Sequence, residues 1–223
     1  RETAEREGFV LAFPNGSSVL PRDHLATWNA GHCCGYARDE KVDDITYVKN
    51  VLKDIQSQLP INPSQIFATG MSNGGMLVHR LASTQPERWA AIAPVIAGLF
   101  GDEPTPAAPV PAFIVNGELD ASIPLEGGAP AGRFRQAWSG RALLPVASQG
   151  RFWAQANACQ QADQQRVWPS HVHWQYHCPA GKDVEQVLVT GVGHAWPGGQ
   201  RGAPGADDPG TRFDATAHIW RFL

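Results

Sequence analysis

Short apolar runs alternate with longer stretches in which apolar residues recur at spacings of three and four. An apolar run bounded by turn residues predicts a buried strand, and the wider spacing predicts an amphipathic helix. The predicted strands cover residues 8–13, 65–69, 90–95, 111–115 and 187–190. The predicted helices cover residues 43–59, 73–83, 143–158 and 214–223. Strands that alternate with helices in this way indicate an α/β fold, in which helices flank a mostly parallel sheet.

The composition is that of a loop-rich globular chain. Of the 223 residues, 23 are Gly and 18 are Pro, while 43% are hydrophobic, which excludes a disordered chain. A net charge of −3 gives no indication of a nucleic-acid partner. The apolar run at residues 89–100 is too short to span a bilayer, and Pro94 interrupts it. We therefore expect a single domain over residues 1–223 with no membrane partner; the sequence does not fix its oligomeric state.

Four cysteines bear on the compartment in which the protein works. Cys159 and Cys178 lie 19 residues apart, and a disulfide between them would contribute roughly 3 kcal/mol in the chain-entropy model. Cys33 and Cys34 are adjacent, so they can form a vicinal disulfide or bond a partner outside the chain. The alternative is four buried free thiols in a cytosolic protein. Because no C-x-x-C pair occurs, zinc and thioredoxin-type sites are disfavoured. Of the two remaining states, we expect the cysteines to be oxidised and the protein to lie in the periplasm or outside the cell.

A serine motif follows the second predicted strand. Residues 70–74, GMSNG, fit the pattern G-x-S-x-G, with a predicted strand before them and a predicted helix after them. That setting is the one a nucleophile elbow requires, because the tight turn lifts the Ser72 hydroxyl above the sheet. It also places the N-terminus of a helix under the reacting centre, where negative charge is favoured. The motif predicts that Ser72 is a nucleophile.

An acid and a histidine follow two later predicted strands. Asp120 comes shortly after the strand at residues 111–115, and His194 comes shortly after the strand at residues 187–190. Ser, then Asp or Glu, then His is the chain order of the catalytic groups in folds of this type. The carboxyl ends of parallel strands gather at one edge of a sheet, where ligand sites form. We therefore predict a catalytic triad of Ser72, Asp120 and His194.

Other acids fit the triad less well. Glu118 lies two residues before Asp120 and is the alternative acid. Three further aspartates follow His194, which is the wrong order for this fold type: Asp207, Asp208 and Asp214.

Other histidines give no clear metal site. His171, His173 and His177 form H-x-H-x-x-x-H, but no acidic or thiolate ligand set surrounds them in the sequence. We expect them to lie on a surface strand. His79 falls in the helix after the serine motif, where a packing or surface role is expected. We predict no metal and no organic cofactor.

The motifs resemble those of the secreted polyhydroxybutyrate depolymerase and feruloyl esterase group of α/β-hydrolases. The matching segments are GFVLAFPNG (8–16), TWNAGHCCG (27–35), VDDITYVKNVL (42–52), INPSQIFATGMSNGGML (61–77), NGELDASIPLEGG (116–128), FWAQANAC (152–159), GVGHAWPGG (191–199) and FDAT (213–216). The resemblance implies the α/β-hydrolase fold and a secreted serine esterase. It also implies a disulfide between Cys159 and Cys178, and substrate contacts at Trp28 and Trp196.

The chain departs from the family pattern in two places. Asn116 stands where the family usually has a His before the Gly. The family also has an early strand and a His-Gly loop that supplies one oxyanion donor, and nothing before Gly8 resembles either. The resemblance places that strand between the predicted strands at residues 8–13 and 65–69, so we expect a chain without the N-terminal strands of the fold. The Asn73 backbone N–H is then the one oxyanion donor in this sequence.

The resemblance implies hydrolysis of carboxylic esters through an acyl-enzyme. The expected substrate is a hydroxyalkanoate oligomer or polymer, or a feruloyl-type ester. A short-chain carboxylesterase and an acetyl-xylan esterase are the alternatives within this chemistry. A peptidase and a non-catalytic pseudo-hydrolase are alternatives of other classes, because a fold does not fix a reaction.

Overall fold

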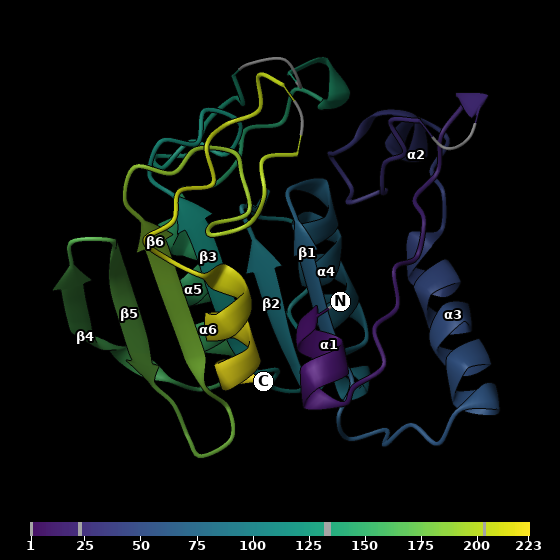
Figure 1. The fold of residues 1–223 in the computed structure, drawn as a ribbon, viewed down its shortest axis with the longest axis horizontal. Helices are drawn as coiled ribbons and strands as arrows, with labels where there is room; N and C mark the ends of the chain where they lie inside the picture. Colours follow the sequence, from purple (N-terminus) through teal and green to yellow (C-terminus); the bar gives the residue numbers. More distant parts are fainter. Residues whose placement is uncertain (1, 22–23, 132–134, 203) are drawn as a thin grey trace.

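The computed structural model describes residues 2–21, 24–131, 135–202 and 204–223. They form one sheet with helices and loops around it (Figure 1). Its six strands lie in the order β1-β2-β3-β6-β5-β4. Their bounds are β1 (Phe67–Met71), β2 (Ala91–Val95), β3 (Ala112–Gly117), β4 (Gln160–Trp168), β5 (His171–His177) and β6 (Val184–Val189). The first four in that order are parallel, and β5 and β4 are antiparallel to their neighbours.

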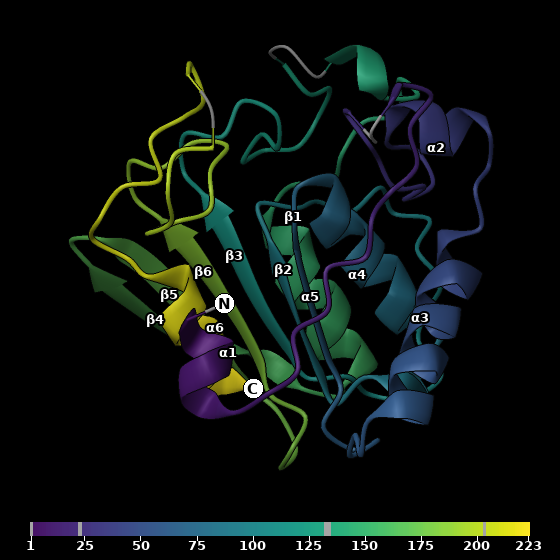
Figure 2. The ribbon, with the colours of Figure 1, turned by 45° about the vertical axis from the view of Figure 1, so that its right-hand side comes forward.

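Helices cover both faces of the sheet, as Figure 2 shows, with α6 on one face and α4 and α5 on the other. The helices are α1 (Glu2–Glu7), α2 (Gly35–Asp39), α3 (Asp44–Gln58), α4 (Asn73–Thr84), α5 (Ala147–Ala156) and α6 (Ala215–Phe222), with short 3₁₀ turns η2 (Pro86–Arg88) and η3 (Arg135–Ala137). This arrangement confirms the predicted α/β-hydrolase type of fold. In the described ranges, every helix is too short or too polar to traverse a bilayer.

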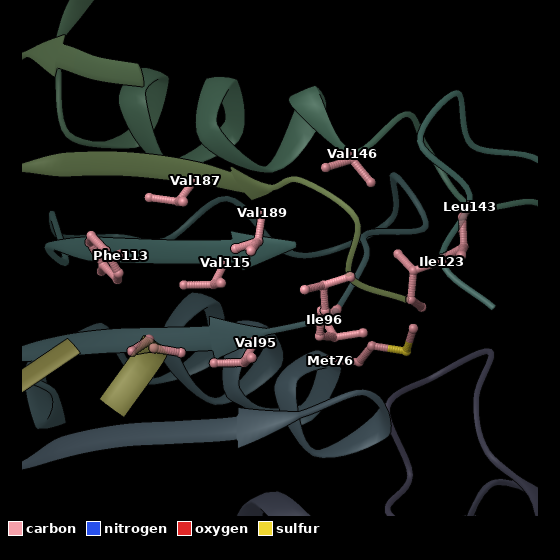
Figure 3. Packing of buried hydrophobic residues seen from close by; sticks show 14 of the residues in the cluster. Met76, Val95, Ile96, Phe113, Val115, Ile123, Leu143, Val146, Val187 and Val189 are labelled. Atoms are coloured by element: carbon pink, nitrogen blue, oxygen red, sulfur yellow. The ribbon is translucent and has the colours of Figure 1, made fainter. Parts of the chain in front are cut away.

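Each face of the sheet has its own hydrophobic core. On the α4 and α5 face, Leu77, Leu81 and Trp153 pack against Ile92 and other strand residues. The other core continues beyond the carboxyl ends of the strands into the loops above them. Figure 3 shows this continuation, from Val95, Val115, Val187 and Val189 on the strands to Met76, Ile96, Ile123, Leu143 and Val146 near the strand ends. The loops that carry the candidate site are therefore anchored by buried apolar side chains.

The prediction of a strand at residues 8–13 is wrong. This segment has an irregular backbone, and the side chains of Val10 and Phe13 are 53% and 68% exposed. A strand needs a neighbour that accepts and donates its ladder of hydrogen bonds, and within the described chain β1 pairs with β2 alone. The segment is held instead at its start, where the ring of Phe9 stacks on that of Trp220 with centroids 4.7 Å apart.

The sequence did not predict the antiparallel strand β4, whereas β5 is the strand expected at His171, His173 and His177. The sequence of β4, QQADQQRVW, is mostly polar and lacks the apolar run that marks a buried strand. Its place at the end of the strand order explains that composition, because an edge strand can present polar side chains to water.

A buried hydrogen-bond network joins three elements beneath the strand ends. The Trp153 indole N–H donates to Nδ1 of His79 (2.9 Å), and Nε2 of His79 lies 2.8 Å from Oε1 of Gln149. The Gln149 amide donates to Oδ1 of Asn116 (3.0 Å), whose own amide donates to the carbonyl of Ala97 (2.9 Å). The tryptophan donor requires an unprotonated Nδ1, so the network holds His79 neutral. It fixes α4 and α5 against the end of β3.

This neutral, buried histidine makes stability depend on pH. Burial lowers the pKa of His79 from about 6.5 to about 4. Between these values the unfolded chain binds a proton that the folded chain excludes. The contribution is complete above about pH 6.5, and up to about 3 kcal/mol is lost as the pH falls to about 4.

The His79→Gln variant, whose amide can accept from Trp153 and donate to Gln149, should lose this part of the pH dependence. Urea unfolding at about pH 8 and about pH 4.5 measures the difference for both proteins. The comparison at the higher pH is the control, because His79 is neutral there in both states. An equally steep loss of stability in the variant would contradict this role for His79.

Candidate active site

Ser72 occupies the turn between β1 and α4 with a backbone conformation that side-chain-bearing residues rarely adopt. Its φ is +57° and its ψ is −123°, a region that usually costs of order 1–3 kcal/mol and is common at active sites. The Ser72 N–H donates to the carbonyl of Val95 at the end of β2 (2.9 Å). The strand on one side and the helix on the other therefore hold the hydroxyl at the carboxyl edge of the sheet.

Two glycines allow the strand and the helix to meet this closely. A Cβ on Gly70 would lie 2.6 Å from backbone atoms of Gly74, and a Cβ on Gly75 would lie 2.7 Å from the Cβ of Ala97. Both distances are shorter than real side chains tolerate. A Cβ on Gly74 would instead meet Trp28 at an ordinary 3.8 Å. The crowding at this turn therefore falls on Gly70 and Gly75, while Gly74 has room for a Cβ.

Of the three residues predicted as a triad, His194 lies within hydrogen-bonding distance of both of the others. His194 Nε2 is 2.8 Å from the Ser72 hydroxyl, and His194 Nδ1 is 2.9 Å from Oδ2 of Asp120. The side chain of Asp120 is 1% exposed, and its other oxygen accepts from the N–H groups of Ser122 (2.7 Å) and Ile123 (2.9 Å). The carboxylate is thus fixed on both oxygens, which favours Nδ1–H on His194 and makes Nε2 the acceptor for the serine hydroxyl.

Asn73, the predicted oxyanion residue, joins the nucleophile turn to a distant loop. Its side-chain oxygen accepts from the N–H of Trp28 (2.6 Å), and its amide donates to the Trp28 carbonyl (2.9 Å). Asn73 is also the first residue of α4, and the first N–H groups of a helix have no partner inside it. Its backbone donor is therefore available beside Ser72.

Trp28 and Trp196, which we predicted to contact the substrate, both contact other residues of the chain. Trp28 packs beside the ring of Tyr47, with centroids 6.3 Å apart, and beside Gly74. The Trp196 indole N–H donates to the hydroxyl of Thr216 (3.1 Å). Their contact with a substrate remains a prediction.

All four cysteines form disulfides. Cys159 pairs with Cys178, and Cys33 pairs with Cys34. The second pair lies close to the nucleophile turn, with the Asn73 amide 3.7 Å from the Cys33 sulfur. Of the alternatives left open by the sequence, the vicinal disulfide is the one formed.

Two of the remaining acidic candidates, Glu118 and Asp207, contact the backbone of the histidine turn, whereas Asp208 accepts from the N–H of Gly210 and Asp214 from that of Ala217. Glu118 Oε2 accepts from the N–H of Gly191 (2.9 Å), whereas Asp120 faces the imidazole. Asp207, set aside because it follows His194, accepts from the N–H of His194 with Oδ2 (2.5 Å). No sequence signal marks Asp207, because the path of a long loop brings it there.

His171 of β5 lies near α6, with its ring centroid 6.0 Å from that of His218. The surface strand expected for them is wrong at His171, which is 8% exposed and lies 4.8 Å from the ring of Phe213. Burial, with the charges of His218 and His173, lowers the pKa of His171. His173 Nε2 is paired with Oε2 of Glu185 (2.7 Å). Within the described ranges, no group of at least three His, Cys, Asp or Glu side chains is arranged to hold a metal ion.

Comparison with known proteins relates the chain to esterases. No family model matches it. It is 27% identical over 208 residues to feruloyl esterase B of Piromyces equi, covering 90% of this chain and 36% of that protein. It is 25% identical over 210 residues to the putative esterase NocK of Nocardia uniformis subsp. tsuyamanensis, covering 88% of this chain and 59% of that protein. The chain thus spans about a third and about three fifths of the lengths of these two relatives.

A solved structure supports the fold. The acetyl xylan esterase from Aspergillus awamori matches with a TM-score of 0.51 and 14% identity, over 80% of this chain and 66% of that one. The likeness confirms the α/β-hydrolase architecture.

The crowding at the nucleophile turn predicts unequal effects for two neighbouring substitutions. Gly75→Ala should lower the free energy of unfolding by about 1–3 kcal/mol, because its methyl group would overlap the Ala97 side chain. Gly74→Ala, at the adjacent position with room for a Cβ, should change stability by less than about 1 kcal/mol. Urea unfolding of the two variants tests this difference, and equal stabilities would contradict it.

Proposed function

We propose that this chain carries the catalytic centre of a serine carboxylic-ester hydrolase. The observation that carries the proposal is the continuous hydrogen-bond chain from Asp120 through His194 to Ser72, set at the start of α4. A serine hydroxyl becomes a nucleophile when a correctly oriented imidazole takes its proton. The names of the sequence relatives support the same chemistry.

In this mechanism the Ser72 oxygen attacks the ester carbonyl while His194 Nε2 takes its proton. Asp120 holds Nδ1–H and stabilises the imidazolium that forms. His194 then gives the proton to the departing alcohol, which leaves an acyl group on Ser72. A water molecule repeats the sequence, with His194 again as the base, and releases the acid.

The Asn73 backbone N–H is proposed as an oxyanion donor. Helix α4 begins at this residue, and a helix N-terminus favours the negative charge that develops on the carbonyl oxygen. The side chain of Asn73 is already engaged by Trp28 on two sides. That double contact holds the donor in place without occupying it.

For the substrate, we propose a feruloyl-type ester. The support is the name of the Piromyces equi relative, which covers most of this chain. The acetyl ester of a xylan, a short-chain ester and a hydroxyalkanoate oligomer are the other outcomes of the substrate test below. We also place the protein outside the cytosol, which the two disulfides support because disulfides persist in oxidising compartments.

Removing the nucleophile should abolish turnover without unfolding the protein. We expect Ser72→Ala to lower kcat on p-nitrophenyl acetate by a factor of about 10⁴ or more and to prevent labelling by a fluorophosphonate. Ser57→Ala, which removes an exposed hydroxyl from α3, is the matched control and should retain full activity. A residual kcat above a few per cent of the wild-type value would exclude Ser72 as the nucleophile. A wild-type protein that the reagent does not label would indicate a non-catalytic domain.

A substrate panel separates the remaining alternatives. We expect kcat/KM to be highest on methyl ferulate, when this ester is compared with acetylated xylan, p-nitrophenyl butyrate, 3-hydroxybutyrate oligomers and casein. Higher values on the oligomers would assign a depolymerase, and higher values on casein would assign a peptidase. Ser72→Ala serves as the blank for each substrate.

A further inference from the structure

His194 lies on a turn rather than on a helix or strand. The turn, residues 191–194, is separated from the end of β6 by Thr190 alone. Its backbone must place one imidazole between two partners, at 2.8 Å and 2.9 Å. A turn has no ladder or helical hydrogen bonds of its own, so contacts from outside it must fix its position.

One side of the histidine turn rests on the loop that carries Asp120. The Leu119 N–H donates to the carbonyl of Val192 (2.9 Å). A Cβ on Gly117 would lie 2.5 Å from that carbonyl oxygen and 2.7 Å from the carbonyl oxygen of Gly193. The two backbones are therefore in direct contact, with no side chain between them at this point.

Glu118 fixes the beginning of the same turn. Its Oε2 accepts from the N–H of Gly191, the first residue after the strand and its flanking Thr190 (2.9 Å). The Glu118 N–H also donates to the carbonyl of Val189, at the end of β6 (3.0 Å). One residue of the acid loop thus contacts both the last residue of the strand and the first part of the turn.

Asp207 fixes the other end of the turn. Its Oδ2 accepts from the N–H of His194 itself (2.5 Å). The same carboxylate covers Gly193, where any Cβ would collide with it. The loop that delivers Asp207 is tied down on both sides, because Gly198 N–H donates to the Pro209 carbonyl and Ala215 N–H donates to the Pro197 carbonyl (both 3.0 Å).

We propose that Asp207 and Glu118 are positioning residues that hold the backbone of the His194 turn in register with Ser72. The proposal rests on the proposed function of this site. Both carboxylates contact backbone N–H groups of the turn, whereas Asp120 contacts the imidazole. A charge-assisted hydrogen bond of this kind is stronger than a neutral one, and a displacement of about 1 Å in a catalytic group can cost about 100-fold in rate.

The acceptor oxygen is what matters in this arrangement, so the amide variant should retain it. We expect Asp207→Ala to lower kcat on p-nitrophenyl acetate by about 10- to 100-fold with KM changed by less than about twofold. Asp207→Asn should recover kcat to within about threefold of the wild type, because the amide oxygen can accept the same N–H. Glu118→Ala and Glu118→Gln should follow the same pattern.

The matched control is Asp208→Ala. Asp208 is the next residue of the same loop, with an exposed side chain that contacts Gly210 and Arg201 instead of the histidine turn. Its removal changes the net charge by the same amount, and we expect kcat within about twofold of the wild type. Thermal unfolding of all the variants separates a loss of position from a loss of stability.

Hydrogen–deuterium exchange gives a readout that does not depend on ester turnover. The backbone amides of residues 191–195 should exchange at least about threefold faster in Asp207→Ala than in the wild type or in Asp207→Asn. A kcat within twofold of the wild type in Asp207→Ala, or no recovery in Asp207→Asn, would overturn the proposal. The proposed function fails if the wild type neither turns over esters nor reacts with a fluorophosphonate. In that case the exchange experiment still tests the positioning role, and an unchanged amide exchange rate in Asp207→Ala would overturn it.

Discussion

The contact between β1 and α4 at Ser72 constrains everything built at the carboxyl edge of the sheet. Neither Gly70 nor Gly75 has room for a Cβ, and Ser72 itself is held at φ +57°. The neighbouring strand contributes through the Val95 carbonyl, which fixes the Ser72 N–H. These contacts fix the backbone of Ser72 at the edge of the sheet, and His194 lies within hydrogen-bonding distance of its hydroxyl.

Different parts of the fold converge on this point by different means. The acid is held by its own loop, since two backbone N–H groups fix the Asp120 carboxylate. The helix behind Ser72 is fixed from below by the buried network from Trp153 to Asn116. The loop at residues 27–35 is tied to Asn73 by two hydrogen bonds. Precision at the site thus comes from polar contacts, while the apolar cores on the two faces supply the bulk of the packing.

The sequence predicts the parts of this structure that are local. Ser72, Asp120 and His194 each come shortly after a predicted strand, so the order of elements and the shared edge of a parallel sheet were enough to predict that they lie together. The strand at residues 8–13 could not be judged in this way, because an apolar run says nothing of whether a neighbouring strand exists. The contact of Asp207 with the histidine turn could not be predicted from the sequence either. It depends on the path of a loop that begins after His194 and returns to it. The polar strand β4 lacked the pattern on which strand prediction depends.

The place of β6 in the sheet has a consequence for how the molecule reaches its working form. β6 follows the other five strands in the chain but lies between β3 and β5 in space. Its pairing with β3 closes a loop of about seventy residues, and contacts of such long sequence separation form late and slowly. His194 is attached to β6, so the imidazole reaches Ser72 when this strand has docked. A chain in which β6 is still undocked would have no base beside Ser72, so the proposed esterase activity would depend on the docking of this strand.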